Sequence, residues 1–285
     1  MRGNRRKLRP PPPAALALNV VTTRATWTLA QAIEGCARHG IRGIAPWRDQ
    51  LRAMGLRQAV ASIRRHRLTV TGLCGGGRFP ARTASQRKAA IQNNLRAIEE
   101  AAELSAGCLI MVVGGLPAGS RDIAGARAQV VDGIAEVLPH ARTAGVRLAL
   151  EPLHPMQVSI ACLNTLEQAL DLCDVLDPAK SGALGVAVDV YHVWWDPKLE
   201  RQIHRAGRRR LHAFHISDWL EPTTDLFDGR GMMGDGVIDL RRIRGYMEAA
   251  GYAGMHEVEI FSTRWARHDP DELMAILKQR HRRFC

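Results

Sequence analysis

Residues 146–154 read VRLALEPLH. A largely apolar run of this length is typical of a strand buried on both faces of a parallel sheet, and here it ends on Glu151. An amphipathic stretch precedes it at 121–143 and another follows at 163–176, each with apolar residues at helical spacing. The local order is therefore helix, buried strand, helix.

The same order continues in both directions along the chain. Predicted strands lie at 16–21, 41–45, 68–73, 108–113, 146–151, 184–189, 211–216 and 257–261. Predicted helices follow them at 27–39, 55–66, 84–105, 121–143, 163–176, 198–206, 239–249 and 270–280. Eight such units in 285 residues predict one α/β domain, an eight-stranded parallel (β/α)8 TIM barrel.

An open doubly wound sheet is the alternative arrangement. Its dinucleotide-binding form carries G-x-G-x-x-G after the first strand, where this chain has TTR at 22–24. The glycines at 75–77 follow the third predicted strand without that spacing, and we interpret them as a flexible turn. The barrel is therefore favoured.

The composition is that of an ordinary globular protein, with 46% hydrophobic and 24% charged residues. No apolar run is long enough to predict a membrane-spanning helix. The six cysteines form no C-x-x-C pair and stand mostly in apolar surroundings. This pattern favours reduced, buried thiols and a cytoplasmic location.

The chain is strongly basic, with a net charge of +12, and 35 of its 40 cationic residues are Arg. We interpret the clusters at 2–9, 205–210 and 280–283 as solvated ends and faces, with anion binding as the alternative. The first cluster leads into four prolines at 10–13, a composition typical of an extended, solvated segment. Residues 1–13 are therefore predicted to be a disordered tail before a barrel at 14–285.

Ionisable side chains stand near the ends of four consecutive predicted strands: Glu151, Asp189, His215 and Glu259. The carboxyl ends of barrel strands meet at one rim, where crowded carboxylates repel one another unless a cation joins them. We therefore predict one divalent metal ion, and this donor set suits Mn²⁺, Mg²⁺, Co²⁺ or Zn²⁺. Glu257 shares a strand face with Glu259, but Glu259 lies closer to the strand end and is preferred.

Five motifs stand in the second half of the chain: LEPLH at 150–154, DVYH at 189–192, HISD at 215–218, RGMMGDGVIDL at 230–240 and EVEIFS at 257–262. With them the chain resembles the xylose isomerase-like TIM-barrel superfamily over residues 15–280. This group includes sugar and inosose isomerases, epimerases, dehydratases and endonuclease IV. The resemblance implies that Glu151, Asp189, His215 and Glu259 are metal ligands and that His192 contacts substrate.

In isomerases of this group a divalent ion holds a sugar carbonyl and stabilises the enediolate that forms when a base removes the adjacent proton. The resemblance implies a metal-dependent isomerase or epimerase of a sugar or related polyol ketone. Glu151 and Glu259 would serve as both ligands and acid/base catalysts, while His192 and Arg230 would bind substrate oxygens. A sugar or inosose is the expected partner, rather than nucleic acid or a membrane.

Three further residues are candidates for substrate binding. Asp218 follows His215 by three residues and is predicted to orient an active-site group; a surface acid is the alternative. His154 could face the pocket or cap its loop, and Trp47 could cover a sugar ring or pack in the core. The tryptophans at 194–195 could line the pocket or join copies of the chain, which leaves a homo-oligomer open.

Two departures from the superfamily keep other functions open. Ketose 3-epimerases of this group commonly carry Glu and Arg at the places where this chain has Gln157 and Glu221. A lyase or dehydratase acting on a keto-sugar or inosose is the first alternative, and a non-catalytic accessory subunit is another. DNA repair is disfavoured, because the additional zinc ligands of endonuclease IV are replaced by CG at 74–75, GG at 114–115 and Arg230.

Overall fold

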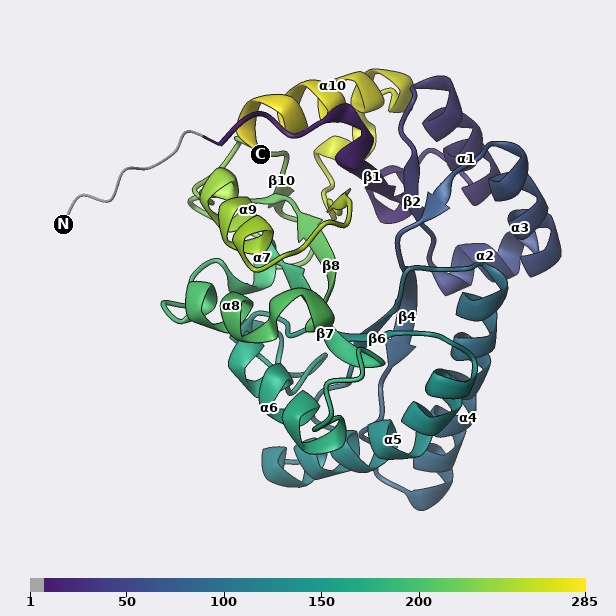
Figure 1. Ribbon diagram of the computed structural model, residues 1–285, viewed down its shortest axis with the longest axis vertical. Helices are drawn as coiled ribbons and strands as arrows, with labels where there is room; N and C mark the ends of the chain where they lie inside the picture. Colours follow the sequence, from purple (N-terminus) through teal and green to yellow (C-terminus); the bar gives the residue numbers. More distant parts are fainter. Residues whose placement is uncertain (1–7) are drawn as a thin grey trace.

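The computed structural model describes residues 8–285. Nine parallel strands form a nearly closed barrel in the order β3-β2-β1-β11-β8-β7-β6-β5-β4, and helices surround them (Figure 1). The strands are β1 Leu16–Asn19, β2 Gly43–Ala45, β3 Thr69–Val70, β4 Leu73–Gly77, β5 Leu109–Val112, β6 Leu148–Leu150, β7 Leu184–Asp189, β8 Leu211–Ile216 and β11 His256–Val258. The predicted TIM barrel is confirmed.

Nine strands fill eight barrel positions because the third predicted strand is split. β3 pairs with β2, whereas β4 pairs with β5. A single bridge between Trp47 and Cys74 links the β2 side of the barrel to β4. The segment Gly75–Gly77, which we expected to be a flexible turn, is the end of β4.

The eight predicted helices all form. They are α1 Leu29–Arg38, α3 Leu56–Arg65, α4 Ala84–Glu103, α5 Ile123–Thr143, α6 Leu166–Leu176, α8 Leu199–Arg210, α9 Leu240–Ala249 and α10 Pro270–Phe284. The structure adds two short helices, α2 Arg48–Met54 and α7 Val190–Val193, and an antiparallel pair outside the barrel, β9 Asp218–Trp219 and β10 Arg230–Gly231. Both added features follow carboxyl ends of barrel strands, where active-site loops of such barrels lie.

The inside of the barrel is packed with small and medium apolar side chains. One buried cluster consists of Cys74, Cys108, Ile110, Ala149, Ala187 and Ala213. It forms the layer of inward-facing side chains next to the ionisable residues, on their amino-terminal side. Ala149, Ala187 and Ala213 each precede one of those residues by two positions in the same strand or run. All six cysteines are free and buried. Among the described residues, no helix is long and apolar enough to cross a membrane.

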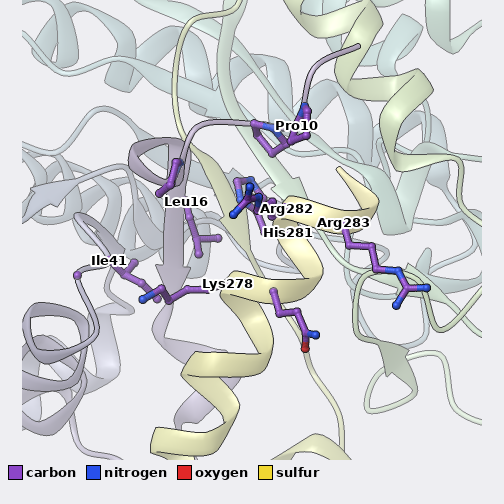
Figure 2. Close-up of a pocket in the computed structure, with 11 residues that line it drawn as sticks. Pro10, Leu16, Ile41, Lys278, His281, Arg282 and Arg283 are labelled. Carbon is purple, nitrogen blue, oxygen red and sulfur yellow. The ribbon is translucent and has the colours of Figure 1, made fainter. Parts of the chain in front are cut away.

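The chain before β1 lies against the body of the molecule. Residues 1–7 of the predicted tail lie outside the described residues. Residues 8–14 are mostly exposed, but they touch the body of the molecule: the Arg9 carbonyl accepts a hydrogen bond of 2.6 Å from buried Arg244, and Pro11 is buried. Beside α10 it borders a cavity of about 550 Å³, around which Figure 2 shows Pro10, Leu16 and Lys278. This cavity lies at the amino ends of the strands and has no carboxylate in its lining.

Candidate metal centre

Four ionisable side chains meet at the carboxyl end of the barrel. Glu151 directly follows β6, Asp189 ends β7, His215 lies in β8, and Glu259 directly follows β11. Each residue offers one ligand atom, and these atoms all lie within 4.8 Å of one another. The parallel registers of β6, β7, β8 and β11 produce this convergence.

The His215 ring lies between carboxylates on both edges. Its Nδ1 is 3.0 Å from Oε1 of Glu151 and 3.4 Å from Oε2 of Glu259. Its Nε2 is 3.3 Å from Oε1 of Glu257. Nδ1 therefore faces the candidate ligands, while Nε2 faces Glu257, the residue considered as an alternative to Glu259 in the sequence analysis.

Asn19 was missed by the sequence analysis, although it closes β1 at the same rim. Its Nδ2 donates to Oε1 of Glu257 at 2.8 Å and to Oε1 of Glu259 at 3.0 Å. Its Oδ1 accepts a 2.8 Å hydrogen bond from Nε1 of Trp47. A polar residue at the end of an apolar strand was the available signal, the same one that indicated the four candidate ligands.

Arg230 enters the site from the β9–β10 pair. Its Nη1 donates to Oδ2 of Asp189 at 2.8 Å and to Oε2 of Glu259 at 3.2 Å. Its Nη2 lies 3.0 Å from Nε2 of His192, and its guanidinium carbon is 4.5 Å from the centre of the Tyr191 ring. The side chain is buried, so its charge is balanced by two of the candidate ligands.

Burial and the neighbouring charges shift the pKa values of the site. Burial raises the pKa of Glu151, and the hydrogen bond from His215 opposes that shift. Burial also disfavours ionisation of Glu259, but His215 and Arg230 outweigh it and lower its pKa. For His215, burial lowers the pKa, but Glu257 and Glu259 raise it well above its usual value.

The donor set fits one divalent cation. Ligand bonds of about 2.0–2.3 Å place ligands on opposite sides of a metal ion about 4–4.6 Å apart, close to the spread of 4.8 Å found here. When ionised, the carboxylates of Glu151, Asp189, Glu257 and Glu259 outnumber the two cationic groups among them. Three oxygen donors and one imidazole suit several divalent ions, so the residues do not select a metal.

A cavity of about 250 Å³ opens above this cluster. Its polar lining consists of Glu151, Gln157, His192, Arg230, Glu259 and Arg78, and its larger apolar lining includes Trp47, Ile110, Val112, Leu153, Ile160, Leu226, Phe227 and Phe261. Pockets for drug-sized ligands take about 300–1,000 Å³. The cavity therefore has room for a small substrate.

Two predicted substrate contacts lie elsewhere. Both carboxylate oxygens of Asp218 accept backbone N–H bonds, at 2.9–3.0 Å from Gly234, Gly236 and Ile238, so this residue holds the loop after β10. The ring of His154 stacks on Trp219 with centroids 5.0 Å apart. Neither residue lines the 250 Å³ cavity.

The remaining predicted contacts lie together at that cavity. Trp47, His192 and Arg230 line it with Glu151 and Glu259. Nδ1 of His192 also accepts a hydrogen bond of 3.2 Å from the backbone N–H of His154. Burial lowers the pKa of His192 to about 3, so its ring is neutral near pH 7.

The chain belongs to the xylose isomerase-like TIM barrel family, whose model matches residues 33–280. It is 55% identical to the protein SMc04130 from Sinorhizobium meliloti 1021, with a TM-score of 0.92 over 95% of this chain and 98% of that one.

Two more distant solved structures share the fold. One is the IOLI protein with a bound zinc atom, at 20% identity and a TM-score of 0.80 over 93% of this chain and 96% of that one. The other is the 3-keto-D-glucoside 4-epimerase YcjR from E. coli, at 20% identity and a TM-score of 0.71 over 93% and 99% of the two chains. No curated protein matches the chain.

Proposed function

We propose that this protein is a divalent-metal-dependent isomerase or epimerase of a small sugar or related polyol ketone. The observation that carries the proposal is the convergence of Glu151, Asp189, His215 and Glu259 within 4.8 Å beside a cavity of about 250 Å³. Membership of the xylose isomerase-like family supports it, as do the activity named for the E. coli relative and the zinc in the IOLI structure.

The four converging residues would hold the ion, which when bound polarises a substrate carbonyl and so acidifies the adjacent C–H bond. Glu151 is suited to move that proton: its Oε1 contacts His215, whereas its Oε2 has no hydrogen-bond partner among residues 8–285. Both oxygens of Glu259 are already engaged, by Asn19 and by Arg230. In an isomerisation the proton would thus pass from the carbon beside the carbonyl to Oε2 of Glu151 and on to the carbonyl carbon, while the proton of the adjacent hydroxyl moves to the carbonyl oxygen.

Arg230 and His192 bind and orient the substrate. They line the cavity beside the candidate ligands, and the buried guanidinium is held by Asp189 and Glu259. A group fixed in this way can donate hydrogen bonds to substrate oxygens without reorganising during the reaction.

Gln157 favours the lyase or dehydratase as the second candidate. Inverting the configuration at one carbon uses acid/base groups on opposite faces of the substrate. This cavity has Gln157 at the place where ketose 3-epimerases of the group commonly have Glu. The Gln157 amide donates to the Leu226 carbonyl at 2.9 Å and takes up no proton near neutral pH. Elimination of water can use a single residue, which takes the proton from the carbon beside the carbonyl and returns it to the departing hydroxide.

Proton NMR of reactions in D₂O separates these functions. Metal-loaded protein is incubated with an inosose or with 3-keto-glucose, and Glu151→Gln serves as the matched variant. An isomerase yields a constitutional isomer and an epimerase a stereoisomer, each with deuterium at the carbon next to the carbonyl, whereas a lyase yields an unsaturated product. If metal is bound and neither probe exchanges a proton, the enzyme proposal is wrong. If the protein is instead a non-catalytic accessory subunit, removing the metal from it should leave its partner bound.

A further inference from the structure

The last residue of β4, Gly77, is held more tightly than a turn requires. Oδ1 of Asn94 accepts the Gly77 N–H at 2.7 Å, and Nδ2 of the same residue donates to the Gly77 carbonyl at 2.7 Å. Asn94 is fully buried. A Cβ on Gly77 would lie 2.0 Å from the Val112 carbonyl oxygen, so only glycine fits there.

This clamp fixes an unusual backbone at the next residue, Arg78. Its φ is +59°, a left-handed conformation that strains the backbone of a non-glycine residue. Its N–H donates to the Val112 carbonyl at 2.9 Å, and a Cβ on Gly114 would approach the Arg78 Cα to 2.9 Å. The fold thus retains an arginine where glycine would relieve strain, and such residues concentrate at ligand-binding sites.

Arg78 is an exposed member of the cavity lining. Within the described part of the chain its side chain makes no ion pair and no hydrogen bond. Other arginines at the same rim are paired: Arg24 with Asp49 and Arg48 with Glu100, each at 2.5 Å. The second arginine of the cavity, Arg230, is neutralised by candidate metal ligands. Arg78 therefore supplies the uncompensated positive charge in this lining.

The other lining residues give a substrate few polar partners away from the metal ligands. Leu153, Ile160, Leu226 and Phe227 offer only apolar side chains, and the Gln157 amide donates to the protein backbone. These contacts alone would hold a small polar substrate weakly. A strong anchor at a single charged group suits this lining better.

We propose that Arg78 binds a negatively charged group of the substrate, a carboxylate or a phosphate, so that the site prefers acidic sugars or polyol ketones over neutral ones. The inference rests on the proposed function and assigns its substrate class. The carbonyl end of the substrate would lie at Glu151 and Glu259, and the acidic end at Arg78. The planar guanidinium can bind either anion through two parallel hydrogen bonds.

The test uses three probes with the same six-carbon keto skeleton: D-fructose, D-fructose 6-phosphate and D-fructuronate. Their dissociation constants are measured by calorimetry on full-length protein loaded with Mn²⁺, at low ionic strength. At least one acidic probe should bind about 10-fold or more tightly than D-fructose, a difference of about 1.4 kcal/mol in binding free energy, because a hydrogen bond to a charged group is stronger than one to a neutral hydroxyl. The phosphate and carboxylate probes distinguish the two anions.

Arg78→Met should weaken binding of the acidic probes until they bind no more tightly than D-fructose, whereas Arg78→Lys should keep part of the preference. Arg82→Met is the matched control, because Arg82 is exposed in the same loop and does not line the cavity. Arg78→Gly relieves the strained backbone and should not lower Tm, which separates loss of binding from unfolding.

The proposal is wrong if neither acidic probe binds more tightly than D-fructose, or if the preference persists in Arg78→Met. The latter result would mean that the anion binds the metal directly. A charge preference without turnover would contradict the proposed function alone. Turnover without a charge preference would contradict this inference alone.

Discussion

Nε2 of His215 lies 3.3 Å from Oε1 of Glu257, on the ring edge opposite to the Nδ1 that contacts Glu151. Glu257 is held in turn by Asn19 at 2.8 Å and by the hydroxyl of Thr71 at 2.7 Å. A carboxylate on the far nitrogen of a metal-binding histidine fixes the ring orientation and raises its basicity as a ligand. Nε2 of His215 is within ion-pair distance of Glu257 but makes no hydrogen bond, so we expect Glu257 to act on the ring through its charge, as a positioning residue for His215 in the proposed metal site.

Replacing Glu257 tests this arrangement. Glu257→Gln keeps the shape and removes the charge, so the affinity for Co²⁺ or Mn²⁺ should fall about 10- to 100-fold, the usual cost of losing such a partner. Calorimetric titration of metal-free protein measures it. The exposed Glu103→Gln is the control. An unchanged dissociation constant, with an unchanged Co²⁺ absorption spectrum, would mean that Glu257 does not position the ring.

Metal content tests the four ligands themselves. Wild-type protein should carry close to one divalent ion per chain by elemental analysis after loading and desalting, and Glu259→Gln should carry much less. The physical reason is that an amide is a weaker, uncharged ligand for hard divalent cations. Glu136→Gln, at an exposed site, should match wild type. Equal, substoichiometric metal in wild type and Glu259→Gln would show that the ligand assignment is wrong.

The candidate metal centre could be predicted from the sequence because its parts are local. Each candidate ligand stands at the end of a short apolar run, and barrel geometry brings such ends together. Asn19 carries the same signal but is no acid, so a search for charged donors passed over it.

Other features depend on contacts between distant segments. Asp218 stands three residues after His215, but its role is set by the amides of residues 234–238, on the far side of a long loop. The glycines at 75–77 suit a turn by local propensity, whereas Asn94 on α4 and the pairing of β4 with β5 hold them as a strand. Neither contact has a counterpart in the local sequence pattern.

Arg230 should make the stability of the protein depend on metal. Its removal leaves Asp189 and Glu259 buried without their cationic partner, and an uncompensated buried charge costs about 3–5 kcal/mol. Arg230→Met should therefore lower the unfolding free energy of metal-free protein strongly. Saturating metal should raise the unfolding free energy of Arg230→Met by more than it raises that of wild type. Denaturant unfolding with and without Mn²⁺ measures both quantities, and equal metal stabilisation of the two proteins would contradict the prediction.

A histidine pair remote from the metal centre predicts how stability depends on pH. Nδ1 of His256 lies 2.9 Å from Nε2 of His281 at the amino end of the barrel, and burial lowers their pKa values to about 4 and about 3. Unfolded histidine titrates near pH 6.5. Below that pH the two histidines are protonated in the unfolded chain but stay neutral in the folded protein. The pair therefore makes the folded state less stable as pH falls from about 6.5 to 4.

The expected slope is up to about 1.4 kcal/mol per pH unit for each histidine. Urea unfolding at pH 7, 6 and 5 measures it. His281→Gln should reduce the slope by the contribution of one histidine, because the unfolded chain then has one group fewer that binds a proton in this pH range. This holds even if the substitution lowers the unfolding free energy at every pH. His204→Gln, at an exposed position, is the matched control and should leave the slope unchanged. An identical pH dependence in wild type and His281→Gln would mean that the buried pair is not held neutral.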